Sequence, residues 1–298
     1  MINESSGTPN IINDIIIGNI NEINISILSK KDLILVIDEY DLKCEVVIKF
    51  NIGSNYSGTL NFLECIKSNF KKCEINLYYP KNESKLIIKS MCHELTHLFE
   101  LYQIKDSYEY GKWKRSEGLH NTRNQDVNLQ MKYFRDIFYL SLPHEINARV
   151  SSLYLYLSSD KSNIEDRLKK TIEYLNYKNL IDFDNDSLYK DLIKKFIDDK
   201  ELLYFMFNHF NKNMGIKTLI NSDIDLFNYL KNSKRYFTDV AKKYKKRIYR
   251  VVNRILNEDN RYTTKGPIIV DYKDYIKENY RERNLDILLN TIDYLSYF

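Results

Sequence analysis

Residues 90–103, SMCHELTHLFELYQ, bring His93, Glu94 and His97 together in a chain that has only five histidines. On an α-helix, positions i and i+4 lie on one face roughly 6 Å apart, so both imidazoles can turn toward a single ion. Neutral imidazole is a good zinc ligand. Glu94 lies one step round the helix, where it can accept a proton from a water that attacks a carbonyl. The spacing therefore predicts a metal-dependent hydrolase.

A catalytic zinc site usually has three protein ligands and one open position, so a third ligand is needed. A third histidine in the pattern H-E-x-x-H-x-x-G-x-x-H is excluded, because Glu100 occupies the glycine position and Gln103 the histidine position. The other common solution is a carboxylate from a later helix, and LPHEINAR supplies Glu145 near a helix start. Ala148, three residues on, would let that helix pack closely. His144 is an alternative ligand, although a role at the helix start is expected of it.

H-E-x-x-H followed downstream by E-x-x-A resembles the pattern of the gluzincin metallopeptidases, over about residues 85–157. The resemblance implies that His93, His97 and Glu145 bind Zn²⁺. It implies that Glu94 is the general base, and that the substrate is a peptide or protein.

The resemblance carries two further implications for the surroundings of the site. The strand at 73–79 should lie at the edge of a sheet and line the substrate groove. Several gluzincins have an Asp four residues after the ligand Glu that orients a ligand histidine, but here Arg149 stands there and cannot accept a hydrogen bond. Support for the histidine must then come from elsewhere, with Asp106 and Asp136 as candidates.

The oxyanion formed in hydrolysis needs a hydrogen-bond donor. His120 is our candidate catalytic donor because it lies in the polar stretch 105–125, a predicted loop that suits a mobile group; simple exposure is the other interpretation. The sequence leaves four other donors open: Tyr108, Tyr110, Tyr139 and Arg149. We interpret His209 as a packed core histidine and Cys92 as a buried thiol.

The elements that position these residues follow from hydrophobic periodicity. Strand signals occur at 33–37, 44–50 and 73–79, and IDEYDLK between the first two is a candidate hairpin connection. Helical spacing predicts a helix at 59–70 and another from Lys85 to about Gln103 that contains HELTH. Further helices are predicted from near Val127, from His144, and at 161–178, 186–210, 216–231, 234–258 and 271–297.

This order of elements predicts an α+β fold. It would be zincin-like, with a small N-terminal mixed sheet, an H-E-x-x-H helix and a mostly α-helical C-terminal half. We divide the chain into a metallopeptidase core at 1–160 and an α-helical subdomain at 161–298.

Composition gives little reason to expect nucleic acid, because 45 basic residues are balanced by 41 acidic ones. The one hint is the basic segment 231–254, which we interpret as a solvated helix face. No apolar run reaches the ~20 residues of a membrane helix, and no signal peptide is recognisable. The four cysteines form no C-x-x-C pair and are interpreted as reduced thiols. We therefore expect a cytoplasmic protein.

A second hypothesis comes from composition alone. Tyrosine is abundant (25 residues) while glycine (8) and proline (4) are scarce, as in proteins of AT-rich genomes. Such proteins include those of bacteriophages that infect low-GC hosts. The alternative function is a structural or packaged virion protein on a zincin scaffold, with a virion or host protein as partner and little or no catalysis.

Overall fold

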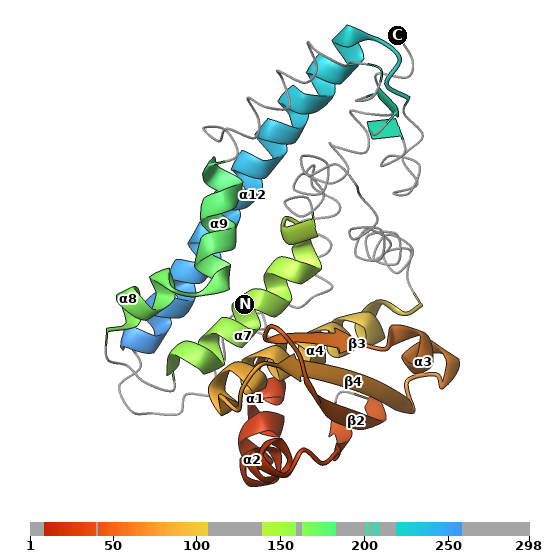
Figure 1. Ribbon diagram of the computed structural model, residues 1–298, viewed down its shortest axis with the longest axis vertical. Helices are drawn as coiled ribbons and strands as arrows, with labels where there is room; N and C mark the ends of the chain where they lie inside the picture. Colours follow the sequence, from red (N-terminus) through yellow and green to blue (C-terminus); the bar gives the residue numbers. More distant parts are fainter. Residues whose placement is uncertain are drawn as a thin grey trace, which may run out of the picture. The chain divides into compact units, whose positions relative to one another are not determined.

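The structure is a computed structural model that describes residues 9–39, 41–106, 139–158, 163–182, 201, 204–205, 207–208 and 219–257 (Figure 1). Four strands and several helices make up these residues. In chain order they are α1 (Pro9–Gly18), α2 (Ile20–Ser29), β1 (Leu33–Glu39), β2 (Leu42–Ile52), β3 (Ser57–Leu60), α3 (Phe62–Lys67), β4 (Lys72–Tyr79), α4 (Ser84–Ile104), α7 (Pro143–Ser158), α8 (Ile164–Lys169), α9 (Ile172–Asp182) and α12 (Asp223–Asn257).

The strands form one mixed sheet in the order β1-β2-β4-β3. β1 and β2 are an antiparallel hairpin whose register pairs Leu35 with Val46, and β2 runs parallel to β4. Along the three longer strands buried and more exposed side chains alternate, so one face of the sheet belongs to the core. The predicted α+β fold class, the three strands and the hairpin connection are confirmed.

The position of strand 73–79 is a correction. It corresponds to β4, which lies between β2 and β3 and is not an edge strand. The edge next to it is β3, which pairs antiparallel with β4 and places Gly58 opposite Leu77. The sequence predicted a helix at 59–70, but only Phe62–Lys67 is helical, and the first two residues of that range belong to β3.

The predicted helix at 85–103 is confirmed as α4, which packs on β3 and β4. It is buried on almost every side between Met91 and Leu101, with His93 half-buried. The helix predicted from His144 is confirmed as α7. Helices α1 and α2 were not predicted; they bury Ile12, Ile16, Ile23 and Ile27 at helical spacing, and α1 contacts α4.

In the later part of the chain the two helices predicted at 216–231 and 234–258 are one 35-residue helix, α12. The single helix predicted at 161–178 is two helices in the structure. Helix α8 is a short helix within this range, and α9 begins within it and ends at Asp182. The predicted loop at 105–125, apart from its first two residues, and the predicted helices near Val127 and at 271–297 lie outside the described residues.

Two compact units divide the chain. The first contains the sheet, α1 to α4, α7 from Asn147 onward, α8 and the end of α12. The second contains the first turn of α7, α9 and α12 as far as Ile248. The predicted domain boundary at residue 160 stays a prediction. None of the helices described is long and apolar enough to cross a membrane.

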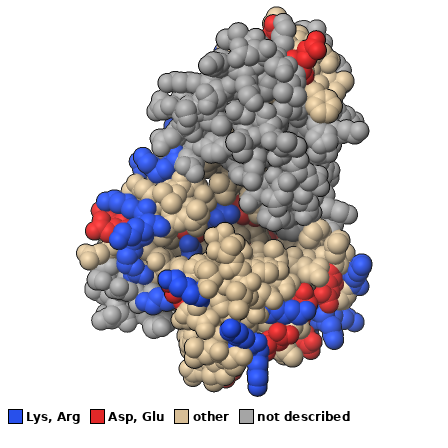
Figure 2. Space-filling view, in the orientation of Figure 1, with Lys and Arg blue, Asp and Glu red and all other residues tan. Residues whose placement is uncertain are grey.

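Charges of both signs are interspersed on the sheet-bearing part at the bottom of Figure 2. Lys49 Nζ lies 2.5 Å from Glu74 Oε2, and Lys72 Nζ lies 3.7 Å from Glu45 Oε1. The Lys49 ammonium lowers the pKa of Glu74 below its usual value. These pairs lie on the solvent-exposed face of the sheet, where an ion pair contributes little to stability.

Candidate metal centre

The two histidines of HELTH face one another on α4. Nε2 of His93 lies 3.1 Å from Nε2 of His97, and the ring centroids are 4.6 Å apart at an interplanar angle of 87°. They are one helical turn apart, as their i, i+4 spacing requires. His97 is 6% exposed and His93 is half-buried. The helix therefore presents two imidazole nitrogens at one buried point.

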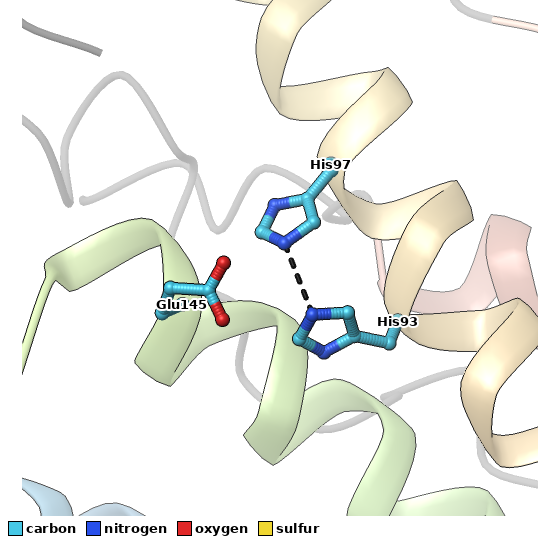
Figure 3. Close-up of side chains that lie close together, drawn as sticks. All are labelled: His93, His97 and Glu145. Carbon is cyan, nitrogen blue, oxygen red and sulfur yellow. Dashed lines mark hydrogen bonds between the residues drawn. The ribbon is translucent and has the colours of Figure 1, made fainter. Parts of the chain in front are cut away.

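The third member of the group is Glu145, in the first turn of α7 (Figure 3). One ligand atom from each of His93, His97 and Glu145 lies within 4.8 Å of the other two, which makes the three a group that could hold a metal ion. Glu145 is 1% exposed, and its Oε1 accepts a hydrogen bond of 2.5 Å from the hydroxyl of Tyr139. This bond fixes the carboxylate, so two imidazoles and one oriented carboxylate converge.

Glu94 is buried against the edge strand β3. A Cβ added to Gly58 would lie 2.6 Å from Cγ and 2.8 Å from Oε1 of Glu94, closer than side chains approach one another. Only glycine at this position lets the carboxylate lie so close to the strand backbone. The edge of the sheet and the predicted base are therefore in direct contact.

Glu100 is a member of the site that the sequence did not identify as such. It lies on α4, 3% exposed, with Oε2 3.5 Å from Nδ1 of His97. Its Oε1 accepts a hydrogen bond from Nδ2 of Asn147 on α7. In the sequence Glu100 was only the residue that excluded a third histidine, and a contact across 47 positions has no local signal.

Several predicted residues have other outcomes. Asp106 is exposed and is no partner of a buried histidine. His144 is fully buried and lies outside the metal-binding group. Cys92 is buried as predicted, and burial raises the pKa of its thiol to about 12. All four cysteines are free thiols. Five residues with predicted roles lie outside the described residues. They are the candidate oxyanion donors Tyr108, Tyr110 and His120, the candidate histidine support Asp136, and the predicted core histidine His209.

The chain was compared with protein families, with curated proteins and with solved structures, and none of them matches it. The site is therefore defined by its own geometry. Together, that geometry and the fold define an α+β protein with a possible buried metal-binding triad.

Proposed function

We propose that this protein is a zinc-dependent hydrolase, a gluzincin-like metallopeptidase that cleaves peptide bonds. The observation that carries the proposal is the convergence of His93, His97 and Glu145, with ligand atoms within 4.8 Å of one another. Two imidazoles and one carboxylate are a donor set of catalytic zinc sites, which leave the fourth position open. The residues present fit zinc, and the same set is a poor match for Mg²⁺ or Ca²⁺, which prefer oxygen ligands.

The roles of the other residues follow from where they lie. Bound zinc would supply Lewis acidity at the site. Glu94, which lies one step round the helix from His93, would be the general base that takes the proton from the attacking water and passes it to the leaving amine. Tyr139, through its hydrogen bond to Oε1 of Glu145, holds that carboxylate in orientation.

The substrate would bind as an extended peptide along β3. Among the described strands β3 is an edge, and it carries Gly58 beside Glu94. An edge strand offers unpaired backbone groups to which a peptide can add as a further strand. A peptide bound in this way would have its backbone next to the predicted base.

The test begins with the metal. Protein purified without chelator should contain about one zinc per chain, the stoichiometry of a single catalytic site. Removal of the zinc should abolish cleavage of a mixed peptide library, and added zinc should restore it. Glu145→Ala should weaken zinc binding by about 10-fold or more, since even the loss of a residue that only supports a ligand costs 10–100-fold.

Glu94→Gln separates metal binding from catalysis. The variant should bind zinc as the wild type does and lose peptide cleavage by about 100-fold or more, the scale of general-base catalysis. Glu22→Gln, an exposed carboxylate on α2, is the matched control and should leave both properties unchanged. Zinc bound by a wild type that cleaves no peptide would contradict the peptidase proposal, and absence of zinc would contradict the metal site itself.

A further inference from the structure

The burial of the Glu100 carboxylate needs a physical explanation. It is 3% exposed in the middle of α4, where an apolar side chain would be buried at no electrostatic cost. A buried carboxylate is tolerated when hydrogen-bond donors surround it. One of its oxygens accepts a hydrogen bond from Asn147, and the other lies near His97.

The first partner is His97. Glu100 lies three residues after it, on the same face of the helix, and its Oε2 is 3.5 Å from Nδ1 of the imidazole. The opposite nitrogen of that ring, Nε2, faces Nε2 of His93. For Nε2 to offer its lone pair to a metal, the ring proton must be on Nδ1. That proton is then on the nitrogen that lies 3.5 Å from Oε2 of Glu100.

The second partner is Asn147. Its Nδ2 donates to Oε1 of Glu100, so the carboxylate is held from α7 while its other oxygen stays on the histidine side. Asn147 is fully buried and lies two residues after Glu145 on the same continuous helix. The hydrogen bond therefore fixes α7 to α4 next to the point where Glu145 reaches the two histidines.

We propose that Glu100 and Asn147 are positioning residues for the metal centre. Oε2 of Glu100 accepts the Nδ1 proton of His97, which selects the tautomer and the ring orientation that present Nε2 to the metal. Asn147 fixes Glu100 in that position. Carboxylates that accept the distal proton of a ligand histidine are a general feature of metal sites, and they raise the basicity of the ligand. Here the carboxylate comes from α4, the helix of the histidine itself. Arg149 of α7 cannot take this role, because a guanidinium accepts no hydrogen bond.

This inference rests on the proposed metal site, and the experiment separates the two. Zinc affinity is measured by competition with a chromophoric chelator, and the ligand field by the visible spectrum of the Co²⁺-substituted protein. Glu100→Gln keeps the size of the side chain and an oxygen for Asn147, but turns an amide toward Nδ1 of His97. We expect zinc affinity to fall about 10–100-fold and the Co²⁺ bands to shift.

Two further variants complete the design. Asn147→Ala should lower zinc affinity in the same direction, because Glu100 is no longer held. Thr96→Val is the control, because Thr96 is buried on α4 and its hydroxyl bonds only to the Cys92 carbonyl among the bonds described, at 2.8 Å. It should leave affinity and spectrum unchanged.

The outcomes are distinct. Wild type that binds no zinc overturns the proposed function and this inference with it. Wild type that binds zinc, with both affinity and Co²⁺ spectrum unchanged in Glu100→Gln, overturns the inference alone. If Glu100→Gln does not fold, Asn147→Ala decides: unchanged zinc affinity in a folded Asn147→Ala protein overturns the inference.

Discussion

Helices α4 and α12 have opposite distributions of polar side chains. In α4 the buried stretch from Met91 to Leu101 includes Glu94, His97 and Glu100. Between residues 231 and 246 of α12 every exposed residue is Lys or Arg, and the apolar residues of this same stretch, Phe237 among them, are buried. Helix α4 buries ionisable side chains, whereas this stretch of α12 exposes its Lys and Arg side chains to water.

The difference follows from what each helix packs against. α12 is amphipathic, so its polar groups are hydrated and its apolar groups provide the stability. α4 is covered on almost every side, so its polar groups must find partners inside the protein. The partners that the structure describes are one another and Asn147 of α7. Internal partnering of this kind costs stability, and we interpret it as the mark of a functional site.

The first prediction tests the buried side of α12. Phe237 is 0% exposed, so Phe237→Ala leaves a cavity and should lower the free energy of unfolding by about 3–5 kcal/mol. Urea unfolding followed by circular dichroism measures the change. A loss below about 1 kcal/mol would be far under the range for a buried aromatic residue and would contradict the packed interior described for α12.

The second prediction tests the contact between Glu94 and the sheet edge. Gly58→Ala would place a methyl group 2.6 Å from Cγ of Glu94, so the carboxylate must move. Peptide cleavage should fall on the order of 100-fold, the cost of misplacing a catalytic group by about 1 Å, while zinc stays bound. Gly18→Ala is the matched control, because an added Cβ there meets nothing within 4 Å. Equal cleavage rates in the two variants would contradict the role of β3.

The sequence predicted the metal-binding group because its signals are local. Two histidines four apart fix their own geometry once the segment is helical, and Glu145 is marked by a helix start. The four residues of β3 gave no such signal, since Ser57–Leu60 is too short to show alternation and follows a turn-rich stretch. Isoleucine makes up five of the ten residues of α1 and four of the ten of α2, and its branched Cβ slightly lowers helix propensity. Only the spacing of the buried isoleucines could have revealed these helices.

The role of Glu100 could not be predicted from sequence for a different reason. It depends on Asn147, 47 positions away, through the packing of two helices. Nothing local distinguishes a glutamate that faces a buried histidine from one that faces water. Arg149 favoured support of a ligand histidine from elsewhere, which stays a prediction; of the two candidates, Asp106 is exposed just after α4, and Asp136 lies outside the described residues.

The smallest expected effect is on the exposed side of α12. Lys246 is exposed, with Lys242 and Lys243 four and three positions before it and Arg250 four after it. Like charges at these spacings destabilise a helix by about 0.2–0.5 kcal/mol per pair, so Lys246→Gln should raise the free energy of unfolding by a few tenths of a kcal/mol. At 1 M salt the screening length is about 3 Å, and the gain should disappear. A loss above about 1 kcal/mol, measured by urea unfolding, would mean that Lys246 has a structural partner and that α12 resembles α4 more than its exposure indicates.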